Sequence, residues 1–148
     1  MIPAETRHAS CVALAGRAAL ITGAHGAGKS RLALELIALG AELVADDLVA
    51  LRREGDAVLA AAPPGAPGLI EARGVGLLPA PTAPETPLSL LVDLDRAETE
   101  RLPPRRVALL LGARIPLILA PASAAAVALW LRRGPPRDPD APLEEPTR

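Results

Sequence analysis

Three short stretches of this 148-residue chain hold side chains that could carry out chemistry together. The first reads Gly23-Ala24-His25-Gly26-Ala27-Gly28-Lys29-Ser30 and fits the pattern G-x-x-x-x-G-K-[ST]. Glycines in such a loop let backbone N–H groups converge on phosphate oxygens, and the following helix adds the favourable end of its dipole. We therefore expect Lys29 to reach the β- and γ-phosphates of ATP and the Ser30 hydroxyl to bind Mg²⁺.

The composition makes this lysine informative. Of the 16 basic residues, Lys29 is the single lysine and the rest are arginine. An apolar strand before the loop and an amphipathic helix after it are the context that a phosphate-binding loop requires. The competing interpretation is a glycine-rich turn at the start of a helix.

The second stretch is the pair Asp46-Asp47, which follows the apolar run Leu43-Val44-Ala45. A strand placed beside the strand of the glycine loop would deliver these carboxylates to the metal side of a nucleotide. Adjacent residues on a strand point in different directions, so one carboxylate can serve Mg²⁺ and the other a proton. A solvated turn is the alternative.

The third stretch, Glu71-Ala72-Arg73-Gly74-Val75-Gly76, adds a carboxylate, an arginine and two glycines. It interrupts a proline-rich region over residues 63–87 that we otherwise expect to be loop. The alternative interpretation of this third stretch is a structural turn. On pattern alone the two histidines carry no signal: His8 is an ordinary polar residue, and His25 has no chemical role.

The elements that must position these residues can be read from hydrophobic periodicity. A hairpin is expected over residues 11–22, with its second strand at 18–22, and a helix of about ten residues from Ser30 to a stop at Gly40. Further strands are expected at 43–45, 48–51, 57–61, 88–94, 107–111 and 115–119, and a helix at 122–133. This order predicts an α/β domain over residues 1–133, with a proline-rich disordered tail at 134–148.

The overall composition excludes several classes of protein. Half of the residues are hydrophobic, 22% are charged and the formal net charge is −1, which argues against a basic nucleic-acid-binding arm. One cysteine, Cys11, cannot form an internal disulfide framework. Because there is neither an apolar run of ~18 residues nor a leader-like segment, we expect a soluble cytoplasmic protein with no membrane or nucleic-acid partner.

Four blocks of the sequence resemble the catalytic domain of the HPr kinase/phosphorylase family. They are His8-Ala9-Ser10, the glycine loop, Leu43-Val44-Ala45-Asp46-Asp47 and Ile70-Glu71-Ala72-Arg73-Gly74-Val75-Gly76. The last is similar to the family signature E-[VI]-R-G-[LI]-G, with Ala72 in place of a β-branched residue. The resemblance implies a P-loop core on a mixed β-sheet that is similar to phosphoenolpyruvate carboxykinase.

The resemblance also implies an activity and a set of site residues. The activity is phosphoryl transfer from ATP to a serine of the small carrier protein HPr, and phosphorolysis of that phosphoserine to give pyrophosphate. Asp46 would exchange the serine proton, Asp47 and Glu71 would bind Mg²⁺ with Ser30, and His8 would be an active-site histidine. Arg73 belongs to the signature, and Arg101 resembles the arginine that contacts phosphate. The usual assembly is a hexamer, so a homo-oligomer is expected.

The chain departs from the longer members of that family. It resembles the compact proteobacterial form without the N-terminal domain, and the proline-rich run 79–87 replaces a longer loop that helps to bind HPr. Two alternatives stay open: a P-loop kinase of a small molecule, and a regulator that binds ATP without turning it over. The small-molecule kinase would need a second pocket lined by Arg52, Arg53, Arg105 or Arg106.

Overall fold

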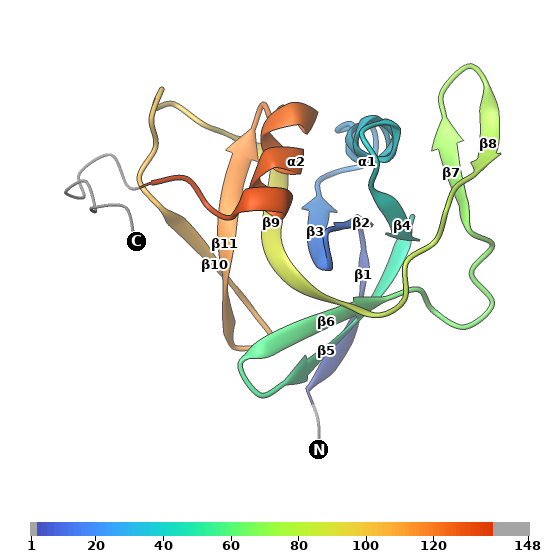
Figure 1. Ribbon diagram of the computed structural model, residues 1–148, viewed down its shortest axis with the longest axis horizontal. Coiled ribbons are helices and arrows are strands. Elements are labelled where there is room, and N and C mark those ends of the chain that lie inside the picture. The colour runs from blue at the N-terminus through green and yellow to red at the C-terminus, as the bar shows by residue number, and fades with distance from the viewer. Residues whose placement is uncertain (1–2, 138–148) are drawn as a thin grey trace, which may run out of the picture.

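The computed structural model describes residues 3–137 of the chain. They form an α/β fold in which two helices cover one face of a curled, mixed nine-stranded sheet, and a separate two-stranded hairpin stands beside it (Figure 1). The α/β class and the mixed sheet are therefore confirmed. The helices are α1 (Lys29–Ala38) and α2 (Ala124–Arg133). The strands are β1 (Ala4–His8), β2 (Ser10–Leu14), β3 (Arg17–Thr22), β4 (Glu42–Ala45), β5 (Leu48–Glu54), β6 (Ala57–Ala61), β7 (Leu69–Ala72), β8 (Gly76–Pro79), β9 (Thr86–Ala97), β10 (Arg106–Leu110) and β11 (Ala113–Ala120).

The direction of the strands gathers four of their carboxyl ends at one edge of the large sheet. The strand order is β1-β5-β6-β9-β3-β2-β4, and β11 pairs with both β9 and β10. β9 is parallel to β3 and to β11, while β2 is antiparallel to both β3 and β4. Strands β3, β4, β9 and β11 thus run the same way, and we call the edge where they end the carboxyl edge. Open α/β sheets bind their ligands outside such an edge.

The expected hairpin and first helix are both present. β2 and β3 pair from Ser10–Ile21 to Leu14–Arg17, and the chain turns at Ala15 and Gly16, whose φ angles are 56° and 75°. The glycine loop then leads into α1, which ends where Gly40 adopts a φ of 107°. A left-handed residue after a helix lets the last turn complete its hydrogen bonds. Gly40 therefore ends the helix at the point where the apolar periodicity of the sequence also ends.

One hydrophobic core lies between the two helices and the sheet. Leu32 and Leu36 of α1 and Leu131 of α2 are buried against Ile21 and Leu90 of the central strands. Each such side chain contributes about 1.5–3 kcal/mol when it is withdrawn from water. This packing fixes α1, and therefore the start of the helix after the glycine loop, over β2 and β3.

A second core fills the concave side of the curled sheet. Figure 1 shows β5 and β6 below β9 and β3, and β10 and β11 to the left of β9; all four strands contribute buried residues to this core together with the central strands. Val49, Val58 and Ile115 pack with Leu20 and Cys11. Complete burial raises the pKa of the Cys11 thiol because the thiolate would lose its hydration. Cys11 is thus a small core residue, as its apolar surroundings in the sequence predict.

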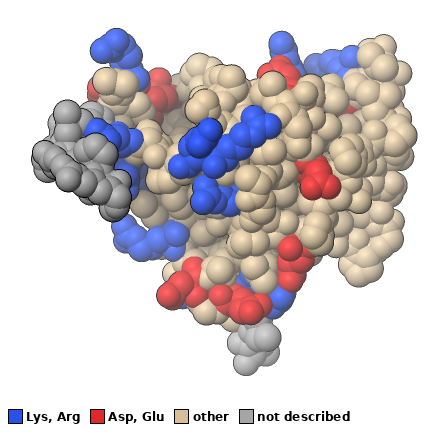
Figure 2. Space-filling model, in the orientation of Figure 1, with Lys and Arg blue, Asp and Glu red and all other residues tan. Residues whose placement is uncertain are grey.

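Two arginines attach α2 at the end of the sheet opposite the carboxyl edge. Arg17, at the start of β3, donates to the carbonyl of Leu131, and Arg132 donates to the carbonyl of Leu39. Figure 2 shows basic side chains in the middle of this face, beside α2, and acidic ones along the edge formed by β5 and β6. Acidic side chains also lie beside basic ones at the upper rim of this view, so the two signs of charge are only partly separated.

The β7–β8 hairpin stands apart from the large sheet and packs against α1 (Figure 1). Ile70 and Ala72 of β7 are buried, while Val75 in the turn and Leu77 of β8 are 75% and 65% exposed. The proline-rich region 63–87 is therefore loop only in part, because the stretch around Glu71 forms two strands that pair with each other.

One strand was not expected, one differs in length, and the predicted tail and domain boundaries stay untested. Strand β1 was not predicted, because its sequence Ala-Glu-Thr-Arg-His alternates half-buried and exposed residues with little apolar character. β9 is longer than the predicted 88–94, since it continues to Ala97 beside β11. Residues 138–148 of the predicted tail lie outside the described residues, and the domain boundaries stay a prediction. No helix within residues 3–137 is long and apolar enough to cross a membrane.

Candidate active site

The glycine loop, residues 23–30, connects the carboxyl end of β3 with the first turn of α1. Gly26 and Gly28 have φ angles of 86° and 103°, a region in which other residues are strained. The Lys29 Nζ donates to the carbonyl oxygens of Gly23 at 2.8 Å and Ala24 at 3.1 Å. The ammonium group thus lies over the loop itself, at the point where the free N–H groups of the helix begin.

The Ser30 hydroxyl reaches the carboxylate of Asp46. Its Oγ is 3.1 Å from Oδ1 and 3.2 Å from Oδ2. Asp46 follows β4, which is not the neighbour of β3 as the sequence suggested, because β2 lies between them. The carboxylate still arrives at the glycine loop because β3 and β4 are parallel and α1 crosses above β2.

Ser10 is a site residue that sequence reasoning missed. Its hydroxyl donates to Oδ1 of Asp46 at 2.6 Å, and the residue is 1% exposed at the start of β2. The sequence offered one signal, because Ser10 belongs to the block His8-Ala9-Ser10 that carries the family resemblance. Nothing in the local pattern shows that this serine faces Asp46.

A second pair of carboxylates lies at the end of β9 and was also missed. Asp95 accepts a hydrogen bond from the backbone N–H of Ala24 at 2.9 Å, and Asp93 accepts one from the N–H of Asp95 at 2.9 Å. Asp93 pairs with Thr22, the last residue of β3. The signal in the sequence was Asp-Leu-Asp at the end of an apolar strand, the same context that singled out Asp46-Asp47.

His8 and Asp47 meet at the same edge. The N–H of Ala9 donates to the carbonyl of Asp47 at 3.2 Å, and His8 pairs with Leu48. Asp47 adopts a φ of 75°, which a turn from β4 into β5 imposes on a non-glycine residue. Both side chains are exposed, and the backbone contacts place His8 and Asp47 on neighbouring segments at this edge.

Glu71 and Arg73 lie on the β7–β8 hairpin, and both are exposed. Among residues 3–137, no three or more His, Cys, Asp or Glu side chains lie close enough to share a metal ion. The expected ligand set of Ser30, Asp47 and Glu71 stays a prediction, and the carboxylate in contact with Ser30 is that of Asp46. Hydroxyl and carboxylate oxygens still fit Mg²⁺, which binds through one or two carboxylates plus the phosphates of a substrate.

Arg101 lies in the exposed segment between β9 and β10, which leaves the sheet at the carboxyl edge (Figure 1). The base of this segment is closed by Glu98 and Arg106, whose two contacts are each 2.8 Å long. The hydrogen bonds from Arg106 lower the pKa of Glu98 to about 2 and outweigh the opposing effect of desolvation. The Glu98–Arg106 ion pair thus joins the two ends of the segment that carries Arg101.

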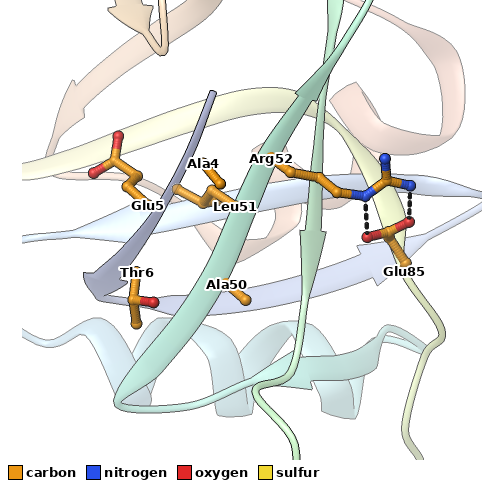
Figure 3. Close-up of a pocket in the computed structure, with 7 residues that line it drawn as sticks. All are labelled: Ala4, Glu5, Thr6, Ala50, Leu51, Arg52 and Glu85. Atoms are coloured by element: carbon orange, nitrogen blue, oxygen red, sulfur yellow. Dashed lines mark hydrogen bonds and ion pairs between the residues drawn. The ribbon is translucent and has the colours of Figure 1, made fainter. Parts of the chain in front are cut away.

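The four arginines proposed for a second substrate pocket are engaged elsewhere. Arg52 forms a bidentate ion pair with Glu85, with contacts of 2.9 Å and 2.6 Å, beside a shallow depression on β1 and β5 (Figure 3). Arg106 pairs with Glu98, and Arg53 and Arg105 donate to backbone carbonyls. Among the described residues they do not converge on one pocket.

Fold and site together define a class of protein: an α/β domain with a strand–glycine loop–helix unit at the carboxyl edge of a mixed sheet. The sequence matches the family described as HPr Serine kinase C-terminal domain over residues 1–105. This chain belongs to that family, which confirms the resemblance drawn from the four sequence blocks.

Individual relatives agree. Over 79 residues the chain is 47% identical to the HPr kinase/phosphorylase of Nitrosomonas europaea, a match covering 53% of this chain and 24% of the relative. Over 109 residues it is 37% identical to that of Geobacillus thermodenitrificans, covering 68% and 35%. The chain thus spans about a quarter to a third of these curated relatives. It superimposes on the Hpr(Ser) kinase/phosphatase from Coxiella burnetii with a TM-score of 0.73 and 27% identity, covering 86% of this chain and 88% of that one.

Proposed function

We propose that this chain transfers the γ-phosphoryl group of ATP to a serine of an HPr-like carrier protein, and that the core around the glycine loop is a P-loop core of the phosphoenolpyruvate carboxykinase type. The contact between Ser30 and Asp46 carries the proposal. It places a hydroxyl and a carboxylate beside the first turn of α1, where the N–H groups at the start of a helix favour the binding of an anion. Family membership supports the same reaction.

The roles of the individual residues follow from phosphoryl transfer, which depends on positioning and charge neutralisation. The loop N–H groups and Lys29 would hold the β- and γ-phosphates, and Lys29 would exchange its contacts with Gly23 and Ala24 for phosphate oxygens. Mg²⁺, held by Ser30, Asp46 and the phosphates, would neutralise charge on the transferred group. Arg101 would approach the same charge from the segment after β9.

For the general base, which takes the proton of the acceptor serine, the geometry favours a different residue from the one that the family resemblance implies. The resemblance gave the proton transfer to Asp46, but its carboxylate already accepts hydrogen bonds from Ser10 and Ser30. Asp47 is exposed beside His8. We therefore place Asp46 on the metal side and assign the proton of the acceptor serine to Asp47. As the serine oxygen bonds to the γ-phosphorus, the bond to the β-phosphate oxygen breaks and ADP leaves.

Phosphorolysis, a homo-oligomeric assembly and a cytoplasmic location belong to the same proposal. In phosphorolysis, inorganic phosphate would attack the phosphoserine to form pyrophosphate, and the base would return its proton to the serine. The exposed Val75 and Leu77 of the β7–β8 hairpin, on the α1 side of the sheet, support a protein acceptor.

The decisive experiment mixes the purified chain with Mg²⁺, ATP labelled at the γ position and the HPr-like protein of the same cell. Label on a serine, released as pyrophosphate when phosphate is added, is the expected result. ATP binding without label on the carrier would refute the protein-kinase assignment. Label on a metabolite would then indicate the small-molecule kinase, and absence of any transfer the regulator.

A further inference from the structure

Ser10 is a polar residue in an otherwise apolar strand. β2 reads Ser-Cys-Val-Ala-Leu, and all five residues are buried. Within residues 3–137, Ser10 and Thr86 are the buried polar residues, and Thr86 satisfies its hydroxyl at a nearby backbone carbonyl. Ser10 instead donates to a carboxylate 36 positions away in the sequence. A buried hydroxyl costs free energy unless it is hydrogen-bonded, so this strand residue has a specific partner in Asp46.

The register of the strands explains why these two residues meet. Cys11 pairs with Ala45, so the next step along both antiparallel strands brings Ser10 opposite Asp46. Side chains that are directly opposite share a face of the sheet, and here it is the face that α1 covers. Ser30 approaches the same carboxylate from α1, so that β2, β4 and the helix meet at one group.

We propose that Ser10 is a positioning residue that holds the Asp46 carboxylate in the orientation in which it meets Ser30. The short 2.6 Å contact fixes Oδ1, and in this orientation both carboxylate oxygens lie within reach of the Ser30 Oγ, at 3.1 Å and 3.2 Å. A carboxylate held in this way does not have to be ordered when Mg²⁺ and nucleotide bind. This assignment rests on the proposed function for the role of Asp46, but the contact itself can be tested without it.

The first test measures the Mg²⁺ requirement of nucleotide binding and phosphoryl transfer. In Ser10→Ala the Mg²⁺ concentration for half-maximal effect should rise about 3- to 10-fold, the value of one lost hydrogen bond. The rate at saturating Mg²⁺ and the affinity for metal-free ATP should change little. Ser10→Thr keeps the hydroxyl and should restore the requirement.

A matched control is Cys11→Ala, which removes a buried group from the neighbouring position of β2 without touching Asp46. It should reduce thermal stability but leave the Mg²⁺ requirement unchanged. If both variants raised the requirement equally, Ser10 would have only a packing role, and the proposal would be wrong. If Ser10→Ala does not fold, Ser10→Cys preserves a side chain of similar shape with a weak donor, and should raise the requirement.

The second test needs no activity. In the wild-type background Ser10→Ala should lower the unfolding midpoint, because it removes a hydrogen bond. In an Asp46→Ala background it should raise the midpoint or leave it unchanged, because the Ser10 hydroxyl is then buried without its carboxylate partner. An equal decrease in both backgrounds would overturn the proposal. A chain that shows the change of sign but does not phosphorylate the carrier would refute the proposed function and leave the positioning contact standing.

Discussion

The carboxylate of Asp95 accepts a hydrogen bond from the backbone N–H of Ala24 at 2.9 Å. This contact joins the end of β9 to the second residue of the glycine loop, across 71 positions of sequence. Packing around Gly23 is equally close, since a Cβ there would lie 3.0 Å from the Cβ of Ala27 and 3.2 Å from that of Leu94. The beginning of the loop is thus fixed by β9 as well as by β3.

Loss of that contact should weaken nucleotide binding. We expect Asp95→Ala to lower the affinity for ATP about 3- to 10-fold, because the loop must then be ordered on binding. Asp95→Asn retains an acceptor oxygen and should lose less. Isothermal titration measures both variants, with Asp56→Ala in the exposed β5–β6 turn as control. Wild-type affinity in Asp95→Ala would show that the loop is ordered without β9.

Lys29 should be indispensable for nucleotide binding. Its ammonium group sits over the loop in contact with Gly23 and Ala24, so phosphate oxygens that bind there will meet it. Lys29→Ala should therefore abolish detectable binding of Mg²⁺-ATP, measured by titration or by protection against thermal unfolding. Arg31→Ala is the matched control, because Arg31 is exposed and pairs with Glu35 on the outer face of α1. Unchanged affinity in Lys29→Ala would exclude the glycine loop as the phosphate site.

The two aspartates should fail in different ways. Asp47→Asn should keep the affinity for Mg²⁺-ATP and reduce phosphoryl transfer about 10²- to 10⁴-fold, the usual contribution of a positioned base. Asp46→Asn should instead raise the Mg²⁺ requirement, because its carboxylate is the one in contact with Ser30. Transfer rates over a range of Mg²⁺ concentrations separate the two effects. The reverse result would return the proton transfer to Asp46.

The ion pair between Glu98 and Arg106 should make stability depend on acidity in a defined range. Hydrogen bonds from Arg106 lower the pKa of Glu98 from 4.5 to about 2, so the folded state favours the ionised carboxylate. The stabilisation is fully present above pH 4.5 and is lost as the pH falls towards 2. Urea unfolding of wild type and Glu98→Gln between pH 2 and 7 should therefore give stability curves that converge at low pH.

The control for this experiment is Glu42→Gln, on the exposed first position of β4. Convergence of the same size in Glu42→Gln would show that the effect does not come from the pair of Glu98 with Arg106. A constant difference between wild type and Glu98→Gln at every pH would show that the pair does not titrate with folding. Since the pair closes the segment that carries Arg101, phosphoryl transfer by Glu98→Gln should also fall at neutral pH.

The sequence predicted the local elements well because they depend on near neighbours. The β2–β3 hairpin, α1 and the β5–β6 pair each follow from apolar periodicity and from a turn or a glycine stop. The same reasoning could not place β2 between β3 and β4, since strand order depends on contacts between distant segments. β1 was missed because an edge strand of mostly polar residues has little hydrophobic pattern.

The candidate site shows the same division. Gly23 to Ser30 and Asp46-Asp47 were found because motif and spacing identify them, and the structure brings Ser30 and Asp46 together. Ser10 was not assigned a role, since a serine at the start of an apolar run looks like any other strand residue. Asp95 was missed because its partner is a backbone N–H, which no sequence pattern identifies. The sequence motif thus identified the glycine loop, whereas Ser10 and Asp95 reach the site through the pairing of strands that are distant in the sequence.

The position of β9 in the sheet also determines when the chain can fold. β3 acquires one neighbour at once from the adjacent β2, but its other neighbour is β9, which is synthesised about 70 residues later. Closing such long loops is slow, and parallel pairing can only follow it. Until residues 86–97 have left the ribosome, the far edge of β3 is an open strand, the kind of surface that aggregates. A fragment that stops before Thr86 should therefore be insoluble, although it contains the whole glycine loop.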